Sequence, residues 1–270
     1  MLKLFAEIFK TSENFGLPRK EFFLAVARTR VKGSLKFFRE IFCFACALGL
    51  AEFVEEKIRE FPVIFPNQQM PALLDASAAD GCPALILGVL NGHPRILTIL
   101  LAYGANPNKT DRFGKTALLH ACKKGDADAV EILLNCGGDA TVEDCSGKNC
   151  MQLAIASKKR KSRGLCVELI SAKFSEIFRD ENAQGVREKI HAIFFEALGS
   201  AAEVGDMEIL QSLTRNFQIM GDNRVRRPKS GSPPLISAVI AKKPESIKVS
   251  LNFQVFDFQG CATFRLGRSR

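Results

Sequence analysis

The segment DRFGKTALLHACKKGDADAVEILLNCGGDAT, residues 111–141, contains the pattern that decides the fold. Its first half, TALLHACKKG, has apolar or small residues at Ala117, Leu118, Ala121 and Cys122. This i, i+1, i+4, i+5 spacing is that of a short helix with one buried face. The sequence therefore predicts a helix that packs along this single face.

A second helix follows almost at once in DADAVEILLNCGG, where Val130, Leu133 and Leu134 form one apolar stripe. Gly137 stands where a helix can end in a left-handed conformation. Gly125 separates the two helical patterns. The segment is therefore predicted to form two antiparallel helices joined by a tight turn.

The same pattern recurs at an offset of 33 residues along the middle of the chain. The glycines that coincide are Gly81, Gly114 and Gly147; Gly92 and Gly125; Gly104 and Gly137. The apolar positions that coincide include Leu85, Leu118 and Met151; Val89, Cys122 and Ile155; Gly88, Ala121 and Ala154. Because turns and core positions recur together, the chain contains an internal repeat.

Residues 80–108, 111–141 and 144–156 resemble ankyrin repeats, whose signature is a 33-residue unit of two helices and a β-turn. The residues that match the family pattern are Gly114, Thr116, Leu118, Ala121 and Gly125. Ala117 replaces the family's proline and Leu119 its histidine. The resemblance implies an all-α ankyrin-repeat solenoid of stacked helix-turn-helix units with short β-turn tips.

Weaker copies of the pattern extend the array on both sides and predict about six helical pairs. The predicted organisation is an N-terminal helical cap (1–36), ankyrin-like repeats (37–175), degenerate repeats after a linker (176–253) and an irregular tail (254–270). Within the second of these, the first unit is degenerate and residues 80–156 carry the best units.

The chain of 270 residues carries 38 basic and 29 acidic side chains, a net charge of +9. This excess favours acidic partners. The nine cysteines are an odd number, and Glu7 interrupts the apolar N-terminal stretch, so we expect reduced thiols inside a cell, in the cytoplasm or the nucleus. The most apolar run, residues 41–51, is shorter than the roughly 20 residues of a membrane-spanning helix, and no span is expected.

Two pairs of residues have a spacing that chemistry could use. His120 and Cys122 lie two positions apart, about 200° around a helix, which is poor geometry for a shared metal or a thiol with its base. Their columns in the repeat hold apolar residues, which favours packing. Cys43 and Cys46 have the spacing of a redox pair or of half a zinc site, but they lie in an apolar helix without a second half, which favours core packing. We expect no catalytic residue, no metal and no cofactor, and therefore no enzyme.

Lys123 and Lys124 occupy columns that vary between repeats while the core around them does not. In ankyrin-like units, such positions and the turn tips line the concave surface. The resemblance carried over by register gives Arg112, Phe113, Lys115, Lys123, Lys124 and Lys148 as partner-binding residues. We expect a protein-protein interaction module, an adaptor or scaffold, that binds an acidic segment of another protein on this face.

The basic run Lys158, Lys159, Arg160 and Lys161 falls in a turn that is about four residues longer than its counterpart. It matches a nuclear-import cluster, so a nuclear regulatory protein is the alternative function. Aromatic residues do not interleave with the basic run, and the chain has no Trp and one Tyr. Base stacking is therefore not indicated, and protein is favoured over nucleic acid as the partner.

Overall fold

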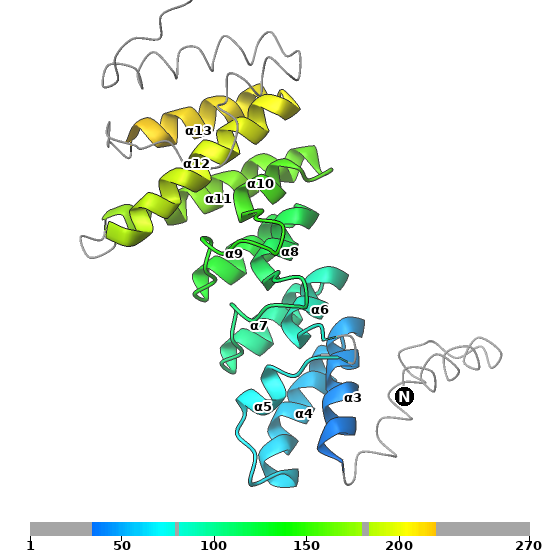
Figure 1. Ribbon diagram of the computed structural model, residues 1–270. Coiled ribbons are helices and arrows are strands. Elements are labelled where there is room, and N and C mark those ends of the chain that lie inside the picture. The colour runs from blue at the N-terminus through cyan, green and yellow to red at the C-terminus, as the bar shows by residue number, and fades with distance from the viewer. Residues whose placement is uncertain (1–33, 79–80, 180–183, 220–270) are drawn as a thin grey trace, which may run out of the picture. The chain divides into compact units, whose positions relative to one another are not determined.

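The computed structural model describes residues 34–78, 81–179 and 184–219 (Figure 1). These residues form helices joined by turns, and among them the β-structure is one bridge between Ser77 and Pro83. The contacts divide the chain into two units, residues 1–121 with 131–139 and residues 122–130 with 140–270. Each unit is described by itself.

The helices of the first unit form antiparallel pairs. The bounds are α3 (Leu35–Leu48), α4 (Ala51–Ile64), α5 (Pro71–Leu74), α6 (Ala84–Asn91) and α7 (Pro94–Ala102), followed by α8 (Ala117–Lys124) and α9 (Ala127–Asn135), through which the division between units passes. Helix α3 packs on α6 and α4 packs on α7. First helices therefore stack on first helices and second on second, as a solenoid requires.

The second unit repeats this arrangement and contains two longer helices, of 20 and 21 residues. They are α10 (Cys150–Ile155), α11 (Arg160–Arg179), α12 (Gln184–Val204) and α13 (Met207–Ile219). Helix α10 packs on α12, and α11 packs on α13. Counting both units, the described residues hold five helical pairs, each with the predicted antiparallel hairpin.

A turn glycine allows one pair to approach the next. Gly49 ends α3 with a φ of 71°, in the left-handed region, and a Cβ added there would lie 2.6 Å from the imidazole Nδ1 of His93. The other ring nitrogen of His93, Nε2, lies 3.1 Å from the carbonyl oxygen of Ala47. Glycine is therefore needed at position 49 for its backbone angle and for the space that the His93 ring fills.

The predicted core columns are buried. Leu118, Ala121 and Cys122 of α8 are at most 1% exposed, and Val130 and Leu133 of α9 are fully buried. Burying each such aliphatic side chain contributes about 1.5 to 3 kcal/mol. The repeated apolar residues thus form the buried face that their spacing predicted, and they pack the two helices of each hairpin together.

Two segments predicted as connections are helical instead. The extended turn expected around Lys158 to Gly164 is short, because α11 already begins at Arg160 and includes Gly164. The same helix continues to Arg179 and α12 begins at Gln184, so the linker expected at residues 175–185 is helical up to Arg179 and again from Gln184. Lys and Arg have good helix propensity, which allows the inserted residues to lengthen the helix rather than the loop.

The remaining organisation falls largely outside the described residues. This holds for most of the N-terminal cap, for the sixth repeat and for the C-terminal tail, which lie in residues 1–33 and 220–270. The predicted boundary after residue 36 lies inside α3. Among the described helices, none combines the length and the apolar character that crossing a membrane would need.

Candidate functional site

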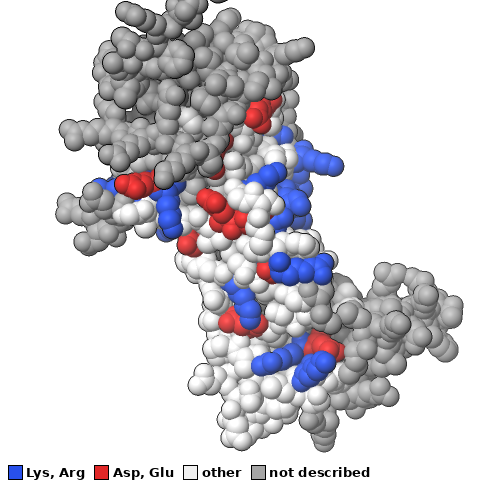
Figure 2. All heavy atoms as spheres, viewed as in Figure 1, with Lys and Arg blue, Asp and Glu red and all other residues white. Residues whose placement is uncertain are grey.

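The surface of the described residues carries both charges. Figure 2 shows Lys and Arg side chains beside Asp and Glu side chains on the face in view. Ion pairs among the described residues include Arg95 with Glu52 and Lys124 with Asp126. The net positive charge of the chain therefore does not make every basic residue available to a partner.

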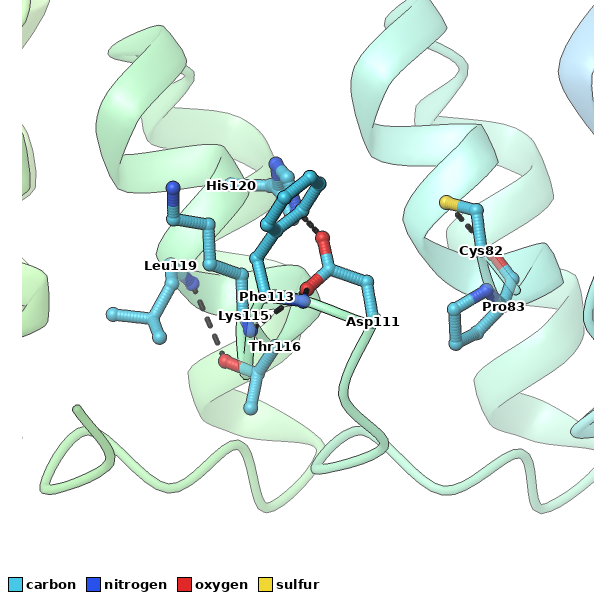
Figure 3. A network of polar contacts seen from close by, with 8 residues as sticks. All are labelled: Cys82, Pro83, Asp111, Phe113, Lys115, Thr116, Leu119 and His120. Carbon is cyan, nitrogen blue, oxygen red and sulfur yellow. Dashed lines mark hydrogen bonds and ion pairs between the residues drawn. The ribbon is translucent and has the colours of Figure 1, made fainter. Parts of the chain in front are cut away.

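The turn before α8 is built around the carboxylate of Asp111 (Figure 3). Its Oδ1 accepts hydrogen bonds from the backbone N–H groups of Phe113 and Lys115, at 2.8 and 2.9 Å. Its Oδ2 lies 2.8 Å from Nε2 of His120, one turn into the helix. The carboxylate therefore fixes the turn tip and ties it to α8.

The electrostatics of Asp111 reflect these bonds. Burial raises the pKa of this carboxyl, but the hydrogen bonds from the Lys115 N–H, His120 and the Phe113 N–H outweigh burial, and the net pKa is lowered. Asp111 is therefore an ionised structural group at neutral pH. It is turned inward and does not offer its charge to a partner.

The turn of the next repeat has the same backbone bonds without the histidine. Oδ1 of Asp144 accepts from the N–H groups of Ser146 and Lys148, at 2.9 and 3.0 Å. Residue 153, one period after His120, is a buried leucine. The aspartate with its two backbone hydrogen bonds thus recurs in both turns, whereas the bond to His120 occurs only at Asp111.

The predicted aromatic anchor lies on the surface at the same tip. Phe113 is 52% exposed, and the guanidinium carbon of Arg112 lies 4.8 Å from the centroid of its ring. Arg112 is also exposed. This cation–π contact keeps the exposed Phe113 ring next to the positive charge of Arg112.

The predicted lysines differ from one another in the structure. Lys123 and Lys148 are exposed. Lys124 is half-buried and its Nζ lies 3.7 Å from Oδ2 of Asp126, so much of its charge is compensated within the chain. Lys115 is half-buried, and its backbone serves the Asp111 turn. Lys123 and Lys148 are therefore the more accessible lysines of the predicted set.

His120 and Cys122 do not form a pair with chemistry. The His120 side chain is 13% exposed and bonded to Asp111. Cys122 is fully buried, and a hydrogen bond with Cys150, followed by burial, raises the pKa of its thiol well above the usual value. A protonated buried thiol is a poor nucleophile. Both side chains are therefore held by contacts within the fold.

Cys43 and Cys46 also lie in the core, at 1% and 0% exposure. Burial raises the pKa of Cys46 well above its usual value, and Cys43 raises it further. Within the described parts of the chain, no group of three or more His, Cys, Asp or Glu side chains could hold a metal ion.

The basic run is divided between a turn and a helix. Lys158 and Lys159 are exposed in the turn before α11, and Arg160 and Lys161 are the first residues of the helix itself. The four residues therefore do not form one extended segment.

Sequence reasoning missed the role of Asp111. A signal was present, because Asp111 and Asp144 recur at the repeat period two residues before an exposed tip residue. The bond to His120 had no such signal, since the column of His120 holds leucine in both neighbouring repeats, at Leu87 and Leu153.

The stacked hairpins and recurring turns define a helical repeat protein. Residues 85–178 match the family model for ankyrin repeats, in three copies, and this part of the chain is therefore made of ankyrin repeats. Ankyrin repeats imply a protein-protein interaction module, and the repeat is in general non-catalytic.

Relatives share the repeats over part of their length. Human ankyrin repeat domain-containing protein 63 is 28% identical over 169 residues, which cover 60% of this chain and 42% of the relative. The mouse inactive serine/threonine-protein kinase TEX14 is 32% identical over 89 residues, 33% of this chain and 6% of its own length. The chain thus spans less than half the length of these relatives.

A solved structure shares the fold. A chain in the complex of a predatory endopeptidase from Bdellovibrio bacteriovorus with an immunity protein superposes with a TM-score of 0.54 at 20% identity. The match covers 78% of this chain and 96% of that one. At this identity the likeness concerns the fold alone.

Proposed function

We propose that this chain is a non-catalytic adaptor or scaffold that binds an acidic segment of another protein on the surface formed by the turn tips and the first helices. The observation that carries the proposal is Phe113, 52% exposed with Arg112 stacked over its ring. In an ankyrin stack, this surface is the concave one, where neighbouring units present their varying residues.

Phe113 and Arg112 supply complementary parts of a binding site. Covering an exposed aromatic ring with a partner removes apolar surface from water, and buried aromatic and arginine side chains dominate many interfaces. Because Asp111 is bonded inward at three points, it does not neutralise Arg112 at the tip. The tip is therefore apolar and positive, which fits a partner with an apolar residue next to a carboxylate.

Lys123 and Lys148 are the exposed basic residues that the proposal uses in the second unit. Both are exposed, whereas Lys124 is paired with Asp126 and contributes less. Exposed charges of this kind affect the association rate and the salt dependence of binding more than the final affinity. We therefore assign Phe113 and Arg112 the anchoring role, and Lys123 and Lys148 the role of attracting the acidic segment.

Charge reversal tests the acidic part of this proposal. The variant Lys123→Glu with Lys148→Glu should lose the proteins that the wild-type chain captures from a native lysate, with capture reduced by about tenfold or more. Its matched control is Arg179→Glu with Arg215→Glu, which makes the same charge change at exposed positions on α11 and α13, both second helices.

The control variant should capture the same proteins as the wild type. Circular dichroism must show that both variants keep their helix content. Equal capture by the wild type and the Lys123→Glu, Lys148→Glu variant would reject the acidic-segment proposal, and equal losses in both variants would show a dependence on net charge alone.

As an alternative, we propose that the basic run is a nuclear-import signal. The chain would then be located in the nucleus. The exposed Lys158 and Lys159 support it, while the helical start at Arg160 opposes an extended import peptide. Replacing Lys158 and Lys159 by Ala should move a fluorescently tagged chain from nucleus to cytoplasm. An unchanged distribution would reject the basic run as an import signal, and a chain that is cytoplasmic with and without the replacement would have the cytoplasm as its proposed location.

A further inference from the structure

A cavity of about 440 Å³ lies between α11 and α13 in the second unit. We call it the α11–α13 pocket. It is lined by Gly164, Val167 and Glu168 of α11, by Asp206, and by Glu208, Ile209 and Ser212 of α13. Its volume lies in the range of ligand pockets, about 300 to 1,000 Å³.

The pocket has an apolar base and, among its described lining residues, a negative rim. Val167 and Ile209 are 1% and 4% exposed, so they form the base, whereas Glu168 and Glu208 are exposed. Neither glutamate has a Lys or Arg three or four residues away on its own helix. The ordinary pairing of charges along a helix is therefore not available to them.

The third acidic group, Asp206, is already used by the fold. Its Oδ2 pairs with the Nη1 of Arg163 at 3.2 Å, and its Oδ1 accepts a hydrogen bond from the Ile209 N–H at the start of α13. The second guanidinium nitrogen of Arg163 donates to the Ser157 carbonyl at 2.8 Å. Arg163 therefore neutralises Asp206, whereas among the described residues Glu168 and Glu208 form no ion pair with a Lys or Arg.

Gly164 keeps the pocket open. It lies within α11, and a Cβ added there would meet no atom within 4 Å. Glycine is the poorest helix former after proline, at a cost of about 1 kcal/mol relative to alanine. Its backbone does not require glycine in a helix, so the missing side chain leaves accessible space at the cost of helix stability.

We propose that the α11–α13 pocket receives a Lys or Arg side chain, with an adjacent apolar side chain, from a segment of a partner protein. The aliphatic stem of Lys or Arg packs on apolar surface while its charged end remains at the polar rim. This matches a base of Val167 and Ile209 beneath Glu168 and Glu208. The partner segment is opposite in charge to the acidic one proposed for the turn tips.

Because the chain has a positive net charge, binding of a basic peptide is a specific test for a local acidic site. A basic peptide is repelled by a chain of net charge +9, so attraction must come from a local acidic site. The probe is a fluorescein-labelled peptide with a central Arg-Leu-Arg, compared with peptides of equal length carrying Glu-Leu-Glu or Arg-Gly-Arg. Fluorescence anisotropy with the full chain measures affinity, and the methyl resonances of Val167 and Ile209 report the place of binding.

The proposal predicts that the Arg-Leu-Arg peptide binds at least about tenfold more tightly than either comparison peptide and shifts both methyl resonances. The variant Glu168→Gln with Glu208→Gln should weaken its binding by about three- to tenfold, since exposed charge pairs contribute modestly. The matched control, Glu131→Gln with Glu203→Gln, changes two exposed carboxylates that do not line the pocket and should bind as the wild type does.

The variant Gly164→Leu separates occupancy from folding. A leucine at this position fills the pocket and suits a helix, so the peptide should bind at least about tenfold more weakly while the midpoint of thermal unfolding stays the same or rises. Equal binding by Gly164→Leu or by the double Gln variant, or equal affinity for the Glu-Leu-Glu peptide, would overturn the proposal.

The basic residues of the chain itself provide the last comparison. Arg224, Arg226 and Arg227 lie outside the described residues and follow α13 in sequence. Replacing all three by Ala should leave binding of the Arg-Leu-Arg peptide unchanged. Tighter binding in this variant would assign the pocket to the chain's own basic segment and overturn the assignment to a partner.

Discussion

Asp111 is the residue on which the turn before α8 depends. Three donors converge on its carboxylate, two from the backbone and one from His120. Because folding lowers its pKa, its ionised form stabilises the fold above the unfolded carboxyl pKa of about 3.9. That contribution is lost as the pH falls through the folded-state pKa.

Replacing His120→Leu gives the residue that both neighbouring repeats carry at this column, and it removes one of the three donors. The free energy of unfolding should fall by about 1 kcal/mol at neutral pH, the typical net contribution of a hydrogen bond. The pKa of Asp111 should rise towards its ordinary value. Urea unfolding and a carbon-detected NMR titration measure the two effects, and an unchanged pKa would show that His120 does not stabilise the carboxylate.

At the scale of the element, the turn glycines differ in what they permit. Gly125, between α8 and α9, has a φ of 64°, and a Cβ there would lie 2.5 Å from the Oγ of Ser157. Gly137, at the end of α9, has a φ of 85°, and a Cβ there would meet nothing within 4 Å. Both positions strain an alanine backbone, but only Gly125 is also closely packed.

Substitution by alanine should therefore destabilise the two turns unequally. We expect Gly137→Ala to cost about 1 kcal/mol from the left-handed backbone, and Gly125→Ala to cost at least about 1 kcal/mol more because Ser157 must move. Chemical denaturation measures both. Adding Ser157→Ala to Gly125→Ala should recover part of the excess, whereas equal costs for the two glycines would contradict the close packing at Gly125.

The elements show which features the sequence could predict. The helical pairs could be predicted because glycines and apolar residues recur together every 33 residues. An assignment made in one repeat can therefore be checked at the same position of the next repeat. The start of α11 could not be predicted, because the inserted basic residues suit either a loop or a helix and have no counterpart in the neighbouring repeats. The α11–α13 pocket could not be predicted from the sequence either, because Glu168 and Glu208 line it from two different helices.

The candidate site was predicted less completely than the fold. The sequence predicted that Phe113 and Lys123 are exposed, but it did not predict the partner of Lys124. Asp126 equally suits the position before α9, where its Oδ1 accepts a hydrogen bond from the Ala129 N–H. A side-chain pair of this kind occurs in one repeat and not in its neighbours. A pattern that is recognised because it recurs between repeats therefore does not predict it.

At the scale of the whole molecule, the cysteines report whether the stacked core is intact. Cys136 and Cys145 are exposed, whereas Cys46, Cys122 and Cys166 are buried. Burial raises the pKa of Cys166 to about 11. A thiol that is both inaccessible and protonated reacts slowly with disulfide reagents.

Native-state labelling should therefore separate the thiols into two classes. With Cys261, which lies outside the described residues, replaced by Ser, Cys136 and Cys145 should react with Ellman's reagent at once and the buried thiols only on unfolding. Mass spectrometry assigns the labelled residues. Labelling of Cys122 as fast as that of Cys136 would contradict the packing of α8.

Protein binding through the turn tips is the central functional claim, and site-specific photocrosslinking tests it most directly. Benzoylphenylalanine is placed at position 113 or, as the control, at position 63 on α4, where Val63 is 81% exposed and far from the tips in sequence. The account predicts that a discrete protein partner crosslinks at position 113, through a peptide rich in Asp or Glu, and not at position 63. The same crosslinks at both positions, or none at position 113 while the folded chain still captures its partner, would contradict it.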